Sequence, residues 1–143
     1  MTSDEIIVQD ARVRNMQNET TSKADGGRRK AGTILSGLLG LALAASAGLK
    51  LSGSETMVAA FEKWNLGDMR VTIGVLEIAG AALYVFPKTA SLGVLVLSSY
   101  FGGAIVAHMS HGELYVVPAI LLGLVWIAQY LRRPEMLASL FDS

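Results

Sequence analysis

The chain has 143 residues, 52% of them hydrophobic, and its equal numbers of basic and acidic residues give a net charge of zero. So apolar a composition is atypical of a small soluble domain and indicates a compact, single-domain integral membrane protein. The balanced charge gives no reason to expect nucleic-acid binding. The absence of cysteine excludes disulfide bonds, thiol catalysis and cysteine-ligated metal clusters.

The first thirty residues are mostly polar and end in the basic run Gly26-Gly-Arg-Arg-Lys30. We expect residues 1–30 to be a disordered cytoplasmic tail, because they contain few apolar side chains. Its basic end is typical of a topology signal attracted to anionic lipid, with docking of a partner as the alternative. A cleaved signal peptide is disfavoured, because both the tail and the apolar stretch after it are too long.

Four apolar runs follow the tail. At about 1.5 Å per residue, each run crosses most or all of a hydrocarbon core of about 30 Å. The sequence therefore predicts an all-α membrane protein, with a four-transmembrane-helix bundle in residues 31–133 and a cytoplasmic C-terminal tail in residues 134–143. The predicted spans are residues 31–49, 71–86, 89–107 and 114–131.

The basic residues are distributed unequally about these spans. Most precede the first span, lie between the second and third, or follow the fourth, whereas Lys50, Lys63 and Arg70 lie on the opposite side. The positive-inside rule then places both termini in the cytoplasm.

The longest connection between spans covers residues 51–69. Ser54 is a plausible N-cap, and Met57, Val58 and Phe61 recur at helical spacing after it. We expect a short amphipathic helix on the outer surface, with Trp64 at the level of the lipid headgroups.

Small residues recur at every fourth position of the first span. Such a stripe allows another helix to approach closely, because helix association in lipid depends on packing. Packing within the chain is the favoured interpretation, and homo-oligomerisation is the alternative. The stripe consists of Gly32, Ser36, Gly40, Ala44 and Gly48.

Glu77 is the only acidic or basic side chain inside the four predicted spans. A carboxylate in hydrocarbon costs roughly 2.5 to 3.5 kcal/mol on insertion scales, so we expect it to face the bundle interior. Arg70 and Gly74 share its helix face, and Tyr100 lies at a similar depth on the antiparallel third helix, about 10 Å below the outer boundary. The spacing therefore predicts a polar pocket near the outer leaflet, with Arg70 near His108 and with Lys50 closing it.

Each of these residues also has a structural interpretation. Glu77 suits a buried ion pair that sets helix register as well as it suits a ligand or proton site. The Tyr100 hydroxyl suits simple packing against a neighbour. His108, His111 and Glu113 have the chemistry of metal ligands, but a helix end running into Gly112 favours solvated histidines, so we predict no metal site.

Segments around these residues resemble the DoxX-like family of small membrane proteins. The resemblance implies a four-helix bundle in a bacterial inner membrane and makes Lys50, Arg70, Glu77, Gly103 and His108 recurrent positions. The family is named for a subunit associated with quinone-coupled thiosulfate oxidation, but this chain lacks the cysteines of thiol-redox relatives. The resemblance is carried by Ser46-Ala-Gly-Leu-Lys50-Leu51, Met69-Arg70, Gly74-Val-Leu-Glu77-Ile-Ala-Gly80-Ala, Tyr100-Phe-Gly102-Gly103-Ala-Ile-Val-Ala-His108 and Tyr130-Leu-Arg132.

Three functions are compatible with this sequence. The favoured one is an accessory subunit or apolar-ligand-binding module, because there is no soluble catalytic domain and no obvious nucleophile. The alternative is a component of a membrane oxidoreductase or isomerase. There the candidate catalytic residues are Glu77 and His108: Glu77 exchanges a proton with a quinone or another lipophilic substrate, and Arg70 and His108 tune it. A proton-linked transporter is the third, and it would need a dimer to enclose a path. The expected partners are the lipid bilayer and either a membrane protein or a second copy.

Overall fold

The structure is a computed structural model that describes the backbone of residues 3–138 and the side chains of residues 7–136. This part of the chain is helical and contains no strand. The last residues of the expected C-terminal tail, 139–143, lie outside the described residues, whereas its first residues include the short helix α6, Glu135–Ala138.

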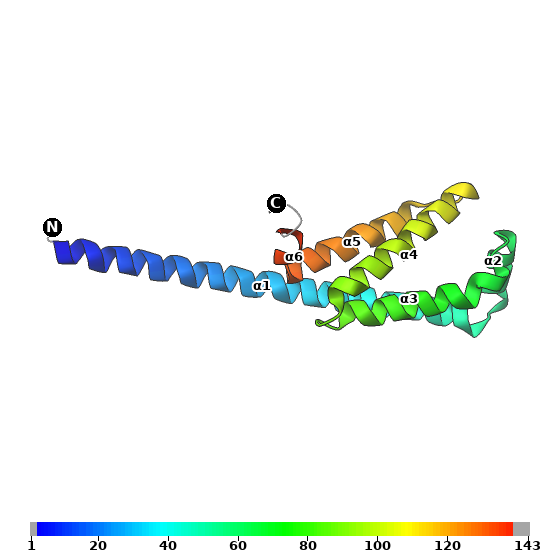
Figure 1. The fold of residues 1–143 in the computed structure, drawn as a ribbon, viewed down its shortest axis with the longest axis horizontal. Helices are drawn as coiled ribbons and strands as arrows, with labels where there is room; N and C mark the ends of the chain where they lie inside the picture. The colour runs from blue at the N-terminus through cyan, green and yellow to red at the C-terminus, as the bar shows by residue number, and fades with distance from the viewer. Residues whose placement is uncertain (1–2, 139–143) are drawn as a thin grey trace.

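Helix α1 runs without interruption over Ser3–Ser52 and projects well beyond the other helices (Figure 1). It therefore contains residues 3–30, for which the polar composition predicts disorder. Local side-chain interactions support this helix: Arg14 donates to Asp10 at 2.6 Å and Arg28 donates to Asp25 at 3.0 Å. Such pairs each stabilise a helix by about 0.2 to 0.5 kcal/mol, and the apolar span that follows provides a nucleus to extend.

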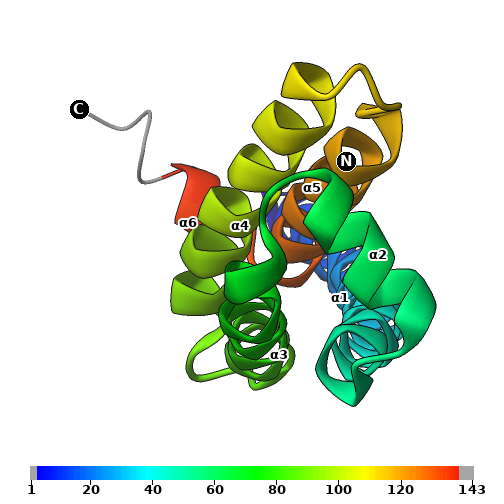
Figure 2. The same ribbon diagram turned by 90° about the vertical axis from the view of Figure 1, so that its right-hand side faces the viewer.

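Three further helices pack with α1. They are α3, Arg70–Val85, α4, Ala90–Ser110, and α5, Val116–Arg132. Helix α1 contacts α3 and α5, and α4 contacts the same two helices from the other side, so the four form a ring (Figure 2). The bounds of α3, α4 and α5 agree with the predicted spans to within three residues, whereas α1 begins well before its predicted span.

Local chemistry sets where these helices begin and end. Helix α3 stops at Val85, because Phe86 precedes Pro87 and adopts an extended backbone. A tight turn then leads into α4, so α3 and α4 form the expected antiparallel hairpin. Pro118 lies in the first turn of α5, where its missing N–H interrupts no helical hydrogen bond.

The connection between α1 and α3 contains α2, Glu55–Lys63, and a single 3₁₀ turn, Gly67–Met69. Ser54 occupies the expected N-cap position of α2, although its side chain makes no capping hydrogen bond. Phe61 is buried, so α2 packs part of its apolar face against the protein.

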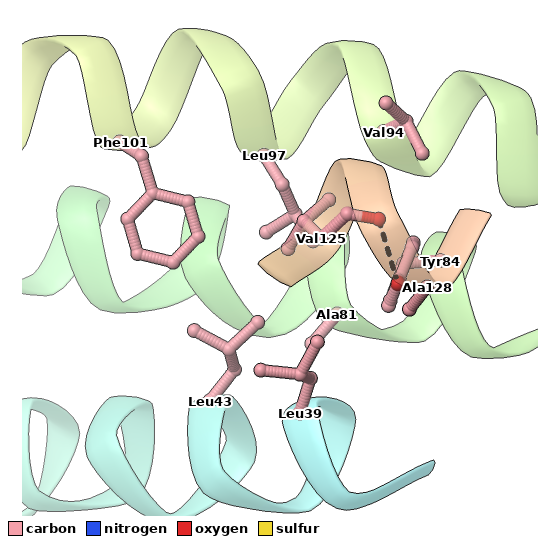
Figure 3. Close-up of a cluster of buried hydrophobic side chains, with 9 residues drawn as sticks. All are labelled: Leu39, Leu43, Ala81, Tyr84, Val94, Leu97, Phe101, Val125 and Ala128. Carbon is pink, nitrogen blue, oxygen red and sulfur yellow. Dashed lines mark hydrogen bonds between the residues drawn. The ribbon is translucent and has the colours of Figure 1, made fainter. Parts of the chain in front are cut away.

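The hydrophobic core lies where all four helices meet (Figure 3). Tyr84 lies at its centre with no exposed surface, and its hydroxyl donates to the carbonyl oxygen of Val125 at 3.1 Å. This hydrogen bond joins α3 to α5, and it leaves no unpaired polar group beside the buried ring. The core contains Leu39, Leu43, Ala81, Tyr84, Val94, Leu97, Phe101, Val125 and Ala128.

Two glycines allow the closest approaches to the backbone of a neighbouring helix. A Cβ atom at Gly93 would lie 2.3 Å from the backbone nitrogen of Tyr84, and one at Gly32 would lie 2.8 Å from the backbone nitrogen of Arg132. Gly32 and Ser36 of the small-residue stripe are thus used within the chain, in agreement with the favoured interpretation. Gly48 is exposed and packs against nothing.

Two segments of the described chain are both long and apolar enough to cross a membrane, Ile7–Ser52 and Ala90–Ser110. Helix α5 is apolar but has 17 residues, and α3 has 16. By length and composition alone, two of the four helices could therefore cross a membrane.

Candidate functional site

The half of the bundle that lies nearest to α2 contains a buried ion pair. Glu77 is 2% exposed, and its Oε2 accepts a hydrogen bond from Lys50 Nζ at 2.8 Å. The same ammonium group donates to Ser46 Oγ at 2.6 Å, one turn earlier on α1. Both charges are therefore satisfied inside the protein, as burial requires.

Arg70 attaches the beginning of α3 to the end of α1. Its guanidinium donates to the carbonyl oxygen of Lys50, in the last turn of α1, where carbonyl groups lack helical partners. Gly74 lies one turn further along α3 and packs against Lys50 and Leu51. Lys50 thus contacts α3 through both its side chain and its backbone, and a cation stabilises the negative end of the helix dipole.

Tyr100 extends this group to α4. Its side chain is half-buried and lies close enough to interact with the Glu77 carboxylate. The inward-facing residues before it, Val94 and Leu97, have no exposed surface, whereas Tyr100, Ala104 and His108 are all half-buried. The packing of α4 against its neighbours therefore loosens towards its C-terminal end.

His108 contacts α2 rather than Arg70. The ring of Trp64, at the C-terminal end of α2, meets the His108 ring edge-on at a centroid distance of 4.7 Å and stacks on His111 at 5.4 Å. The expected pairing of Arg70 with His108 is thus replaced by an aromatic contact. Trp64 therefore lies against the C-terminal end of α4.

An ion pair also joins the end of α2 to the chain just beyond α4. Lys63 Nζ donates to Glu113 Oε1 at 2.5 Å, which links the end of α2 to the loop between α4 and α5. The Lys63 ammonium lowers the pKa of Glu113 below its usual value, and His108 and His111 lower it further. We refer to Lys63, Trp64, His108, His111 and Glu113 as the outer latch.

Gly103 does not line the site. It is exposed, and a Cβ atom placed on it would meet nothing within 4 Å. Among the described residues, no group of three or more His, Asp or Glu side chains converges as a metal site would require. A shallow pocket of about 540 Å³ opens beside Arg70, lined by Val58, Glu62, Asn65, Gly67, Asp68 and Arg70.

A second polar cluster, at the opposite end of the bundle, was not predicted. Ser36 lies 3.2 Å from the Tyr84 hydroxyl, and Arg132 donates to the Tyr84 carbonyl at 2.8 Å and to Gln129 Oε1 at 3.0 Å. The guanidinium of Arg132 also lies 4.8 Å from the centre of the Tyr84 ring. A glutamine inside an apolar span, fully buried in the structure, was the sequence signal for this cluster.

Residues 34–128 match the model of the DoxX-like family. The chain belongs to this family. No curated protein and no solved structure matches it. Family membership and the apolar helices together indicate a small membrane protein. All the predicted site residues of this DoxX-like protein lie inside the matched segment, whereas most of the projecting part of α1 lies outside it.

Proposed function

We propose that this DoxX-like protein is a non-catalytic, four-span protein of the bacterial cytoplasmic membrane that acts as an accessory subunit or as a binding module for an apolar ligand. The observation that carries the proposal is the Lys50–Glu77 pair, in which the one acid within the spans is bound by the chain itself. A carboxylate that is 2% exposed and already paired holds α1 and α3 together rather than meeting a substrate.

The proposed orientation follows from charge. Arg132 packs beside Gly32 of α1, and Lys88 lies in the turn between α3 and α4, so these basic residues share one end of the bundle. Placing that end in the cytoplasm satisfies the positive-inside rule, with α2 and the outer latch on the opposite side. Helices α3 and α5, with 16 and 17 residues, are close to the minimum of about 17 residues for a span.

The binding region is proposed from the loosened outer half of α4. Tyr100 offers a hydroxyl beside the Glu77 carboxylate, and the outer latch joins α2 to the end of α4. Sites for apolar ligands typically combine an apolar lining with a few polar groups. The ligand class favoured is a lipophilic molecule with one polar end. A quinone fits that description, and acid–base chemistry by Glu77 upon it remains the alternative, with less support from a paired carboxylate.

Native mass spectrometry of gently solubilised protein tests this proposal. We expect either a different membrane protein in fixed stoichiometry or a bound lipophilic small molecule. A Tyr100→Phe variant should retain about fivefold less ligand, since one neutral hydrogen bond contributes about 1 kcal/mol. Tyr130→Phe is the matched control, because that side chain is exposed. A protein carrying neither partner nor ligand would contradict both forms of the proposal.

A further inference from the structure

The outward face of α1 is an uncharged stripe that continues from the apolar span into the projecting part of the helix. Its positions follow one another at intervals of three or four residues, so they lie on one side of a helix with 3.6 residues per turn. Every one of them is exposed. We call this face the α1 seam: Val13, Met16, Thr20, Ala24, Gly27, Ala31, Ile34, Leu38, Leu41, Ala45 and Leu49.

The seam lies opposite the face of α1 that packs in the bundle. Ile34, Leu38 and Leu41 are 65%, 60% and 70% exposed, whereas Ser36 and Leu43 on the other side are almost fully buried. Charged residues border the seam in the projecting part: Arg12 and Asp10 flank it, and Lys23 and Lys30 lie along one edge, at the same three- and four-residue spacing. An occupant can therefore approach along the whole length without displacing the bundle.

The projecting part of α1 lacks the packing that a helix in water needs. Every side chain of residues 7–25 is exposed. Isolated helices are marginal in water, and most helical stability comes from packing of an apolar face. Val13 and Met16, which are 42% and 59% exposed, present such a face outside the apolar span.

We propose that the α1 seam is the dimer interface of this protein, formed with the α1 of a second copy in parallel orientation. The partner must be apolar in the span and must continue as a helix into water, because the seam does both. Lipid can cover only the span, since the projecting part continues straight out of the bundle (Figure 1). A second α1 has the required length and register by symmetry.

The size of the seam is sufficient for a specific interface. From Val13 to Leu49 it is about 54 Å long at 1.5 Å per residue, and a helix is about 10 Å wide. Each chain therefore offers about 540 Å², and the pair buries about 1,100 Å², close to the lower bound of about 1,000 Å² for specific association. Ala24, Gly27 and Ala31, in the middle of the seam, permit close approach of the two backbones.

Single-cysteine cross-linking of the full chain in membrane vesicles tests this interface directly, since the natural sequence has no cysteine. Met16→Cys lies on the seam, and Asn18→Cys, also exposed, lies on the opposite side of the same turn. Leu38→Cys and Thr33→Cys form the matched pair within the span. Under catalysed oxidation the seam variants should give at least about fivefold more disulfide dimer than their controls, since the bond requires Cα atoms about 4.4 to 6.8 Å apart.

A charge placed on the seam gives an independent measurement. Native mass spectrometry of the full chain should show two copies of 15.2 kDa for the natural protein and for Asn18→Glu, but one copy for Met16→Glu. Both substituted side chains are exposed, so neither change disturbs the bundle. Equal cross-linking at seam and control positions, attachment of Met16→Cys only to a different protein, or a natural protein with one copy would overturn the proposal.

The inference relies on the proposed membrane crossing of α1 but not on the proposed binding role. A dimer without another partner or a lipophilic ligand would support the seam while contradicting the binding role. A ligand-bound single copy would do the reverse. The pair Met16→Cys and Asn18→Cys lies outside the apolar span, so its result does not depend on how many helices cross the membrane.

Discussion

Replacing Lys50 by Met is the most informative perturbation of the buried ion pair. Methionine has a similar length but no charge, so the change leaves the Glu77 carboxylate 2% exposed and without its cation. Removing one partner of a buried pair typically costs about 3 to 5 kcal/mol in the free energy of unfolding. Glu77→Gln should cost less, about 1 to 3 kcal/mol, since Ser46 still accepts from the Lys50 ammonium.

The double variant Lys50→Met with Glu77→Met distinguishes the net contribution of the ion pair from the cost of leaving one charge unpaired. Desolvating two charges offsets most of their mutual attraction, so replacing both by apolar groups is often neutral or stabilising. We therefore expect the free energy of unfolding of the double variant to lie within about 1 kcal/mol of that of the natural protein. It should lie well above that of the Lys50→Met single variant. Reversible unfolding in mixed micelles, followed by helical circular dichroism, measures these differences.

Lys63→Met provides the matched control. It makes the same substitution in the pair of the outer latch, where the lysine side chain is 66% exposed rather than 15%. Solvent and salt screen that pair, so its loss should change stability far less. The reasoning is refuted if Lys50→Met is no more destabilising than Lys63→Met, or if the double variant is as unstable as Lys50→Met.

Three further predictions concern other contacts. Gly93→Ala should lower the free energy of unfolding by about 3 kcal/mol, because the added Cβ would meet the α3 backbone. Gly103→Ala should be tolerated, and denaturation in micelles compares the two variants. Arg132→Ala should cost about 1.5 to 3 kcal/mol by removing charged hydrogen bonds, and Arg133→Ala less. Glu113→Gln should lower the melting temperature at pH 7 but not once pH falls through the lowered pKa of Glu113, because a depressed carboxyl pKa stabilises the fold only above that range.

The sequence predicted the elements better than it predicted their contacts. The four apolar runs reappear as helices, because apolar content and length depend on local composition alone. The burial of Glu77 was also predictable, since an exposed carboxylate in hydrocarbon is too costly. The residue that pairs with Glu77 was not predictable. Lys50, Arg70 and His108 all lay at compatible depths, and the rotation of each helix about its axis determines which of them reaches the carboxylate.

The remaining differences arise from contacts between distant segments. His108 meets Trp64 because the C-terminal end of α2 lies against the end of α4. The spacing of apolar residues along the sequence does not predict where α2 lies. The helical continuation through residues 3–30 differs from the expected disorder, which rested on polarity and neglected a helix already nucleated by the following span. Gln129 was overlooked because it is uncharged, although a buried amide requires partners as a charge does.

The Lys50–Glu77 contact also constrains how the chain enters a membrane during its synthesis. The two residues are 27 positions apart, so at about 5 to 20 residues per second Glu77 leaves the ribosome roughly 1 to 5 s after Lys50. Until then the Lys50 ammonium lacks the carboxylate that it binds in the folded protein. In the proposed topology we therefore expect α1 and α3 to enter lipid together, since each carries a charge that the other pairs.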